Sequence, residues 1–506
     1  MASTIDTPEA DQQAAPAPID TSGSHHAVRD REWRFLVDGR LRPAVNGGTF
    51  ERISPFTRDV IATVPSGDAD DAEVLAEAAW AARKGWARTP MPERIAALRR
   101  AIDIIEAHAD ELAFLDAIDA GSTLANARMD ITLALEHMRL FAGLAMEVKG
   151  ATIPASRGLH LTVREPIGVV VRIVPFNHPF MFAAKVFTAI VAGCPTILKS
   201  PEAAPLSALR MGELMKDVFP AGVLQVSTAR GRALADALVR HRRVAKIAFI
   251  GSESTGAAIS QAAAASGFKR VTLELGGKNA MMVFEDADLD RAAQGAIFGM
   301  NFTWSGQSCG SNSRLLVQRS VHDALVGKIA EKLQHHRLGD PLDPAANQGT
   351  MIHERQFDTA LEYIEQAKQD GGSIVTGGGR PDDPALGDGL FVAPTVITGL
   401  PLDSRVVREE IFGPVLSVIP FDTEEEALEI ANSLDYGLTA SVWTSDISRA
   451  LRVVHEVEAG FTWINDSSKH FTNVPYGGVK SSGVGREESM EELLSYTELK
   501  TINIAY

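Results

Sequence analysis

The sequence predicts an α/β protein in which parallel sheets are covered by helices on both faces. Between about residues 168 and 250, apolar runs of strand length alternate with helical patterns. These runs are apolar at nearly every position, which is typical of parallel strands that are buried on both sides. Short polar or glycine-rich motifs follow several of the runs directly. Because ligands bind at the carboxyl ends of such strands, the fold class also predicts where a site should lie.

The first block of this fold begins near Trp33, after residues 1–28, which are rich in Ala, Pro, Ser, Thr and Asp. Such a segment buries too little apolar surface to offset its ordering entropy, so we expect a disordered tail. Helices are indicated by apolar stripes such as Ile95, Leu98 and Ile102. The expected strands are 35–37, 168–174, 196–199, 223–226 and 244–250. The expected helices are 68–86, 92–120, 130–148, 180–192, 204–219 and 231–240.

A second block of the same kind extends from about residue 271 to residue 463. Its expected strands are 280–284, 315–317, 392–395 and 415–421, with a helix over 321–333. Two segments fit neither block. Residues 149–164 form an extended excursion that contains Gly and Pro, and residues 501–504 alternate like an edge strand. Both segments would suit pairing with a second subunit.

Composition excludes several functional classes. The formal net charge of −16 argues against a nucleic-acid surface, which needs clustered Lys and Arg. Two cysteines cannot build a disulfide framework and fit a reducing compartment. The N-terminus lacks the pattern of a signal peptide, and no run reaches the roughly 18 apolar residues of a membrane span. We therefore expect a cytoplasmic protein.

Cys309 lies among small residues in the stretch Asn301–Arg314. A cysteine that is placed for packing usually has bulky apolar neighbours, whereas these neighbours let a backbone bend and a ligand approach. A thiol becomes a nucleophile when a helix N-terminus or a nearby donor lowers its pKa. An inert buried cysteine is the alternative, and this stretch alone leaves both interpretations open.

Two further residues could complete such a site. Glu274 lies in an otherwise apolar strand, where burial would raise its pKa toward the range of a general base. Pairing of Glu274 with Lys278 is the alternative. Asn177 lies between two prolines directly after the strand 168–174, where its amide could donate to an oxyanion. For Asn177 the alternative is a role in capping the loop.

Other strand-end motifs could bind a nucleotide. Lys199 and Glu202 could hold ribose hydroxyls, and a carboxylate there would repel a 2′-phosphate. A surface ion pair is the alternative for these two. Ser252 follows a glycine turn before an Ala-rich helix, which suits a pyrophosphate, although the stretch is not G-x-G-x-x-G. Glu410 and Phe412 lie just ahead of the expected strand 415–421.

In their order along the chain, these motifs resemble those of the aldehyde dehydrogenase superfamily from about Trp33 to Tyr506. The matching motifs are PFNHP (175–179), LKSPE (198–202), FIGSESTG (249–256), LELGGK (273–278), GQSCG (306–310), EEIFGPV (409–415) and PYGGVKSSGVGRE (475–487). NFTW before GQSC, PFNHPFMF and HF-x-x-VPYGG are similar to bacterial aromatic-aldehyde dehydrogenases, including those that oxidise carboxybenzaldehydes.

The resemblance implies a Rossmann-like NAD domain, an α/β catalytic domain and a small β oligomerisation arm. The expected division is 29–148 with 165–270 for the NAD domain, 271–470 for the catalytic domain, and 149–164 with 486–506 for the arm. It also implies a homodimer or homotetramer that acts on a small-molecule aldehyde, with no nucleic-acid or membrane partner and no metal.

The resemblance further implies roles for single residues. Cys309 would attack the aldehyde carbon, the Asn177 amide would hold the oxyanion, and Glu274 would activate the hydrolytic water. Glu487 matches a carboxylate that is sometimes assigned a proton relay. NAD is the implied cofactor, and its expected binding residues are Val174, Pro175, Phe176, Lys199, Glu202, Gly251, Ser252, Gly276, Glu410 and Phe412.

Substrate-binding residues are expected where the chain departs from the common pattern. Trp304 stands five residues before Cys309, where the superfamily often has Asn, and aromatic walls suit a flat ring. We expect Lys469 or His470 to attract an anionic substituent. The stretch from Asn177 to Lys199 is one residue shorter than usual, which would shift Lys199 slightly. The expected pocket residues are Phe182, Phe302, Trp304, Ser308, Lys469 and Phe471, with Phe180 as a further candidate.

Three functions are compatible with these residues. The first is NAD-dependent oxidation of an aromatic aldehyde to its acid, through a thiohemiacetal and a thioester on Cys309. The second is a semialdehyde or aliphatic aldehyde dehydrogenase of the same superfamily. The third, a non-catalytic binding protein on this fold, would require loss of the nucleophile or the base, and both are present.

Overall fold

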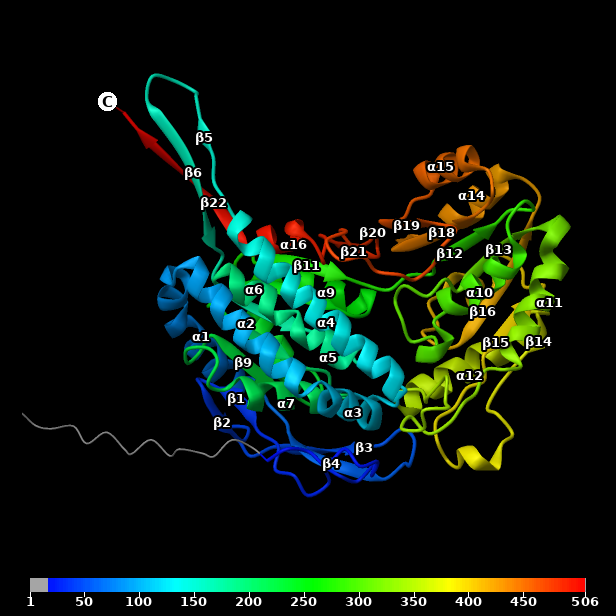
Figure 1. The fold of residues 1–506 in the computed structure, drawn as a ribbon, viewed down its shortest axis with the longest axis horizontal. Coiled ribbons are helices and arrows are strands. Elements are labelled where there is room, and N and C mark those ends of the chain that lie inside the picture. Colours follow the sequence, from blue (N-terminus) through cyan, green and yellow to red (C-terminus); the bar gives the residue numbers. More distant parts are fainter. Residues whose placement is uncertain (1–16, 506) are drawn as a thin grey trace, which may run out of the picture.

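The computed structural model describes residues 17–505, which form two α/β units and a projecting arm (Figure 1). The first sixteen residues of the expected tail lie outside the described residues. Residues 17–28 were expected to be disordered, but they pack against the core of the first unit and also contact the second unit. Ile19 and Val28 are buried, and the His25 ring lies 2.8 Å from Asp340. The apolar residues near the end of the segment thus suffice to fix it.

The first unit is built on an eight-stranded sheet with the order β2-β1-β9-β8-β7-β10-β11-β21. Its five central strands are parallel, and they are β7 Val169–Ile173, β8 Thr196–Lys199, β9 Leu224–Ser227, β10 Val244–Ile250 and β11 Arg270–Glu274. The antiparallel edges are β1 Phe35–Val37, β2 Arg40–Arg42 and β21 Gly483–Val484. The chain order therefore reverses between β7 and β10, which is where a doubly wound sheet binds its ligand.

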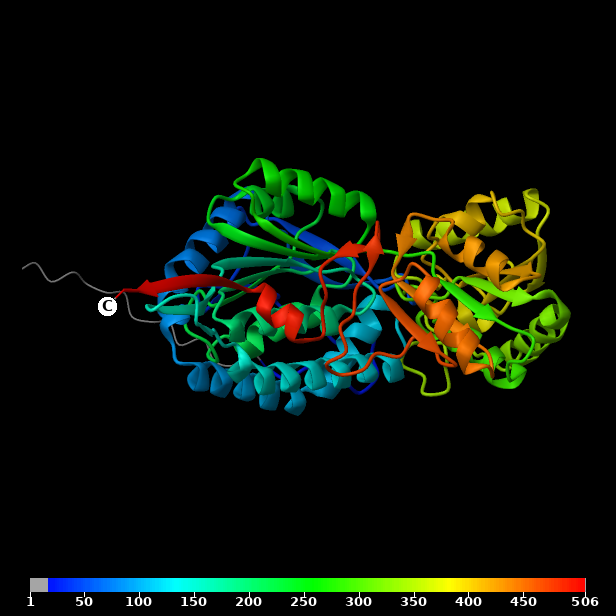
Figure 2. The same cartoon turned by 90° about the horizontal axis from the view of Figure 1, so that it is seen from above.

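Helices cover both faces of this sheet, as Figure 2 shows from above. One face carries α1 Ala69–Arg88, α8 Ala233–Arg240 and α9 Glu253–Ala265. The other face carries α2 Met91–Ala107, α3 Ala109–Ala120, α4 Leu124–Leu144, α5 Pro179–Ala184, α6 Val186–Ala192, α7 Leu206–Met215 and α16 Met490–Ser495. The fold class predicted from the sequence is confirmed.

Two of the expected helices are each divided in the structure. The segment 92–120 breaks at His108, whose backbone leaves the helical region with φ −115° and ψ 18°. The segment 180–192 breaks at Lys185, whose N–H donates to the Phe182 carbonyl three residues back. This tight turn separates α5 from α6 and places Lys185 at the junction, beside the site described below.

The second unit is a seven-stranded sheet with the order β14-β15-β16-β13-β12-β18-β19. Its strands are β12 Ala280–Val283, β13 Arg314–Gln318, β14 Ser373–Thr376, β15 Thr395–Thr398, β16 Val415–Phe421, β18 Thr439–Trp443 and β19 Phe461–Ile464, and all but β14 are parallel. The expected strand 392–395 begins only at Thr395, because Pro394 has no N–H to donate to a ladder.

Helices also cover both faces of the second sheet. One face packs on α10 Leu289–Gly299 and α11 His322–Leu333, and the other on α12 Glu354–Gln369, α14 Glu424–Asn432 and α15 Ile447–Glu456. The smaller elements are β3 Thr49–Ile53, β4 Val60–Pro65, η2 Phe302–Trp304, α13 Arg405–Arg408, β17 Tyr436–Gly437 and β20 Val479–Lys480. The two sheets divide after β11, so Glu274 belongs to the first sheet rather than to a unit that begins at residue 271.

The arm is a three-stranded antiparallel sheet that stands away from both units (Figure 1). It consists of β5 Thr152–Ile153, β6 Leu159–Pro166 and β22 Thr497–Ile504. The C-terminal strand β22 pairs with β6 of its own chain, from Thr497 opposite Pro166 to Ile504 opposite Leu159. Its other edge is open in the described chain, so pairing with a second subunit stays a prediction. No helix among residues 17–505 is long and apolar enough to cross a bilayer.

Candidate active site

Cys309 lies in a tight loop between η2 and β13. Gly306 adopts φ 66°, and a Cβ there would come within 2.2 Å of the Gly413 carbonyl oxygen, so only glycine fits. The Asn279 side-chain amide donates to the Cys309 carbonyl at 2.7 Å and to the Ser311 carbonyl at 3.0 Å. The small residues around Cys309 therefore serve a sharply bent backbone that leaves the thiol half-buried.

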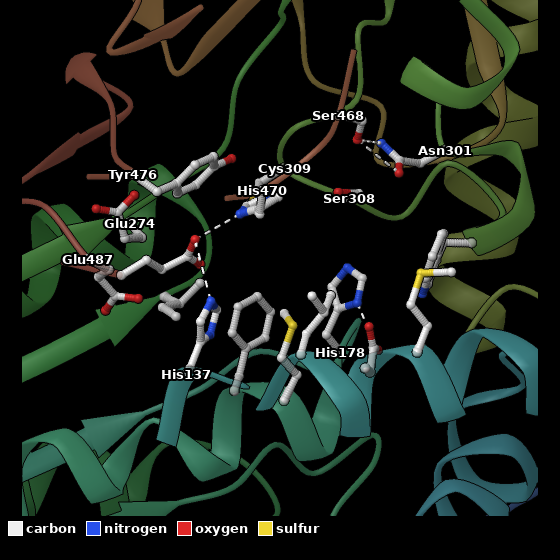
Figure 3. A pocket seen from close by; sticks show the side chains of 18 of the residues that line it. His137, His178, Glu274, Asn301, Ser308, Cys309, Ser468, His470, Tyr476 and Glu487 are labelled. Atoms are coloured by element: carbon white, nitrogen blue, oxygen red, sulfur yellow. Dashed lines mark hydrogen bonds and ion pairs between the residues drawn. The ribbon is translucent and has the colours of Figure 1, made fainter. Parts of the chain in front are cut away.

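Two cavities meet at Cys309. The α4 cavity, shown in Figure 3, has a volume of about 240 Å³ and is lined largely by α4, α5 and the loops around residues 301–309 and 468–470. The strand-end cavity has a volume of about 400 Å³ and lies at the carboxyl ends of β7, β10 and β11. Both cavities are lined by Phe182, Ile250, Glu274 and Cys309. A thiol and a carboxylate are thus shared between them.

Glu274 ends β11 and is buried, and its Oε2 atom has no hydrogen-bond partner among the described residues. Burial raises the pKa of this carboxyl well above its usual value, and the negative charge of Glu487 adds to the effect. The alternative of a pair with Lys278 is wrong, because the Lys278 ammonium has no hydrogen-bond partner in the described chain. Glu274 is therefore a carboxyl group that keeps its proton to a higher pH than an exposed glutamate does.

The Cys309 thiol is also shifted away from its charged form. Burial raises its pKa to about 12, and the carboxyl groups of Glu410 and Glu274 contribute further. The Tyr476 hydroxyl and the Lys185 ammonium act in the opposite direction and favour the thiolate. The ionised Glu274 carboxylate therefore opposes ionisation of the Cys309 thiol at the junction.

A buried ion-pair cluster lies behind Glu274. Glu487 accepts from Arg172 and from Lys185, each at 2.6 Å. Glu488 accepts from Lys185 at 3.2 Å and lies 2.9 Å from the His470 ring. Burial alone would raise the pKa of Glu487, but the two cations outweigh it and lower that pKa to about 2. The pKa values of the neighbouring carboxyl groups Glu487 and Glu274 are therefore shifted in opposite directions.

Most of this cluster was not predicted from the sequence. Glu487 was expected, whereas Arg172, Lys185 and Glu488 were not. The signal that could have found them is Arg172, the one charged residue in the apolar run Val169–Ile173. A guanidinium buried in a central strand requires a buried carboxylate partner, and its partner here lies 315 residues further along the chain.

Asn177 lies on the loop from β7 to α5, is buried, and lines the strand-end cavity. Most of the expected cofactor-binding residues line the same cavity. They are Pro175, Phe176, Gly251, Ser252, Gly276, Glu410 and Phe412. The Val174 side chain is buried, and this residue is not part of the wall.

Glu410 is fixed by the glycines of the LELGGK motif. Its Oε1 accepts from the Gly277 N–H at 3.0 Å, and a Cβ on Gly276 would meet its Oε2 at 2.0 Å. Burial raises its pKa to about 7. Phe412 adopts φ 57°, and its ring lies edge-on to Phe176 with the centroids 5.9 Å apart. Glu410 and Phe412 thus face the cavity across from the loop after β7.

Lys199 and Glu202 lie farther along the strand ends. Lys199 lines a third cavity, of about 430 Å³, between α8 and α9, and burial lowers its pKa. Glu202 accepts from the Gly231 N–H at 2.6 Å, so it holds the loop before α8. An amine, a carboxylate and the start of α9 are the groups that a dinucleotide requires.

The structure separates the expected pocket residues into two groups. Phe182, Trp304, Ser308 and Lys469 line the α4 cavity. Phe302 and Phe180 are fully buried in the cores of the two units, and Phe471 is 46% exposed, so the expectation that they form pocket walls is wrong. Although both belong to the short turn η2, Phe302 packs in the core of the second unit and Trp304 lines the α4 cavity.

The expected positive charges are not free. The Lys469 ammonium lies 3.0 Å from Asp466, and the His470 ring lies 2.9 Å from Glu488. Lys185, the other lysine on the cavity wall, pairs with Glu487 and Glu488. The cations that line this cavity are therefore neutralised by carboxylates of the chain itself, which disfavours an anionic substituent.

Comparison with known proteins agrees with this geometry. The model of the aldehyde dehydrogenase family matches residues 43–502. The aldehyde dehydrogenase tropH of Talaromyces stipitatus is 42% identical over 479 residues, which is 93% of each chain.

Solved structures are similar over nearly the whole chain. PnpE in complex with nicotinamide adenine dinucleotide is 38% identical, with a TM-score of 0.91, over 94% of this chain and 97% of that one. Betaine aldehyde dehydrogenase of Staphylococcus aureus in complex with NAD+ is 36% identical, with a TM-score of 0.92, over 96% and 97% of the two chains. The chain belongs to the aldehyde dehydrogenase family.

Proposed function

We propose that this enzyme oxidises an uncharged aromatic aldehyde to its carboxylic acid with NAD. The observation that carries the proposal is the shared wall of the two cavities, where Cys309 and Glu274 are exposed to both. A substrate in the α4 cavity would then meet the thiol from one side, and a cofactor in the strand-end cavity would meet it from the other. This position favours a nucleophilic Cys309 over the alternative of an inert buried cysteine.

The residues at the strand ends fit NAD. Lys199 and Glu202 would hold the adenosine ribose, the start of α9 at Ser252 would receive the pyrophosphate, and Glu410 with Phe412 would position the nicotinamide riboside. The NAD complexes of PnpE and of betaine aldehyde dehydrogenase support this assignment. When bound, NAD supplies the oxidant, since it accepts the hydride that leaves the aldehyde carbon.

The chain's own residues account for the remaining chemistry. The Cys309 thiolate would attack the carbonyl carbon, while the Asn177 amide and the Cys309 N–H donate to the resulting oxyanion. Departure of the hydride leaves a thioester on Cys309. Glu274 in its ionised form would then take a proton from water, whose oxygen attacks the thioester. Cleavage of the C–S bond releases the acid and restores the thiolate.

The walls of the α4 cavity favour a flat apolar substrate. Phe182 and Trp304 supply aromatic faces, and Leu133 and Met181 supply aliphatic contacts. A semialdehyde dehydrogenase would need an unpaired cation for the distal carboxylate, and the lysines of this wall are ion-paired. The cavity therefore favours the aromatic substrate over the semialdehyde.

A substrate panel tests this preference. With NAD, we expect kcat/KM for benzaldehyde to exceed that for succinic semialdehyde by at least about 100-fold, since a buried unpaired carboxylate is costly. Hexanal should lie between them, because it fills the apolar cavity without stacking. Initial rates of NADH formation measure all three. Equal or better oxidation of succinic semialdehyde would contradict the aromatic assignment.

Glu202 should determine the preference for NAD over NADP. In Glu202→Gln we expect the ratio of kcat/KM for NAD to that for NADP to fall by about tenfold, because the repulsion of a 2′-phosphate is removed. Asp236→Asn is the matched control, since Asp236 lines the α8–α9 cavity together with Lys199 but lies outside the LKSPE motif. If the ratio of kcat/KM for NAD to that for NADP fell in Asp236→Asn and not in Glu202→Gln, the role given to Glu202 would be contradicted.

We also propose that the arm pairs with a second copy of the chain. Leu499 and Ile504 of β22 and Ile153 of β5 are exposed apolar side chains on a small sheet that projects from the molecule. A sheet with an open edge and uncovered apolar residues is suited to burial against a partner subunit. A cytoplasmic location stays a prediction from the sequence.

A further inference from the structure

An unpaired hydrogen-bond donor lies in the wall of the α4 cavity. The Trp304 side chain is 9% exposed, and its indole Nε1–H has no acceptor among the described residues. An indole N–H can only donate, and a buried donor without an acceptor costs free energy. The wall that should contact the substrate therefore presents a donor that the protein itself leaves unsatisfied.

A hydrogen-bond acceptor lies next to this donor. The His178 Nδ1 atom is 2.9 Å from the Asp130 carboxylate, and Asp130 is buried on α4. Because a carboxylate only accepts, Nδ1 carries the proton of this bond, and in this tautomer Nε2 is the acceptor nitrogen of the ring. Figure 3 shows the His178 ring rising into the cavity, apart from the group formed by Glu274 and Glu487.

The two groups belong to one surface. The ring centroids of His178 and Trp304 are 5.6 Å apart, and the His178 ring lies 5.5 Å from Phe182, perpendicular to it. Among the other polar groups of the wall, those of Asn301 and residues 468–470 already have partners within the chain. Lys469 pairs with Asp466, His470 with Glu488, and the Asn301 amide with Ser468. Trp304 and His178 are thus a donor and an acceptor side by side in a mostly apolar cavity.

We propose that Trp304 and His178 form a subsite for a hydroxyl group, so that the preferred substrates are aromatic aldehydes with a ring hydroxyl. This inference rests on the proposed function and narrows its substrate class. A hydroxyl oxygen accepts from the Trp304 indole, and its proton is donated to His178 Nε2. A carboxylate would satisfy the indole but would face the acceptor nitrogen of His178, with the Asp130 charge behind it. The donor–acceptor pair therefore selects a hydroxyl.

The test compares substrates of equal size with and without the hydroxyl. For wild-type enzyme with NAD, kcat/KM is measured for the three hydroxybenzaldehydes and the three methylbenzaldehydes. We expect one hydroxy isomer to exceed its methyl counterpart by at least about tenfold, because a site built to bond a hydroxyl rejects the analogue that lacks it. Trp304→Phe, which keeps a ring and removes the N–H, should lower this ratio by about tenfold.

Phe182→Leu is the matched control, since it trims the same wall without removing a polar group. It should change kcat/KM for both members of the pair alike and leave their ratio within about twofold. A second test uses the wild-type enzyme alone. Phenol should inhibit benzaldehyde oxidation competitively, and at a lower concentration than toluene does.

The outcomes separate this inference from the proposed function. Efficient oxidation of benzaldehyde, with hydroxy and methyl derivatives equal and with phenol no better than toluene, overturns the hydroxyl subsite alone. An unchanged ratio in Trp304→Phe also overturns it. Failure to oxidise any aromatic aldehyde overturns the proposed function, and the subsite with it.

Discussion

Replacement of Cys309 by alanine is expected to lower kcat for aldehyde oxidation by at least about 10⁴-fold, because the covalent route is lost entirely. The rest of the junction remains, since the Asn279 amide holds this loop through backbone carbonyls. NAD binding, measured by titration calorimetry, should therefore stay within about twofold of the wild type. Steady-state NADH formation at saturating aldehyde measures the loss.

Cys194 provides the matched control for the thiol. It is fully buried, its Sγ lies 3.3 Å from the Tyr496 carbonyl, and burial raises its pKa to about 11. Cys194→Ala should keep the activity of the folded enzyme within about threefold of the wild type, since the residue touches neither cavity. Retained activity in Cys309→Ala, or its loss in Cys194→Ala alone, would show that the nucleophile has been misassigned.

Replacement of Glu274 by glutamine is expected to separate the two halves of the reaction. The Glu274 charge opposes ionisation of Cys309, so its removal favours the thiolate and leaves formation of the thioester intact. Hydrolysis loses its base, which should slow steady-state turnover by about 10²- to 10⁴-fold. Stopped-flow absorbance should then show a burst of about one NADH per active site, followed by a slow phase.

The pH dependence of thioester hydrolysis by the wild-type enzyme follows from the raised pKa of Glu274. A base acts only in its ionised form, and burial together with the charge of Glu487 raises the pKa of Glu274 well above its usual value. Hydrolysis by wild-type enzyme should therefore quicken as the pH rises and level off above the raised pKa. Glu274→Gln should lack this step. A rate that falls over the same range would contradict the assignment of Glu274 as the base.

Much of the fold could be predicted from the sequence because its central strands are continuously apolar. The strands 196–199, 244–250 and 415–421 are confirmed at both ends. Buried parallel strands have this local signature, so no long-range information is needed. The helix breaks at His108 and Lys185 could not be predicted in this way, since apolar periodicity continues through both positions.

The site could be predicted where residues follow a strand end, and not where it is assembled across the chain. Glu274 and Asn177 lie at strand ends and line the strand-end cavity together with Cys309, while their catalytic roles stay predictions. The Glu487–Lys185 pair joins residues 302 positions apart, and no local pattern indicates it. The residues of the pocket wall could not be predicted from the local sequence either. Phe302 and Trp304 are both aromatic, and only the folded structure shows that Trp304 lines the cavity and Phe302 does not.

The central claim is that Cys309 carries the acyl group and Glu274 releases it. Peptide mass mapping of Glu274→Gln, quenched after the NADH burst with benzaldehyde, tests it most directly. We expect a benzoyl group on the peptide that contains Cys309 and none on the peptide that contains Cys194. A burst of NADH with Cys309 unmodified, or a benzoyl group on another residue, would contradict the account.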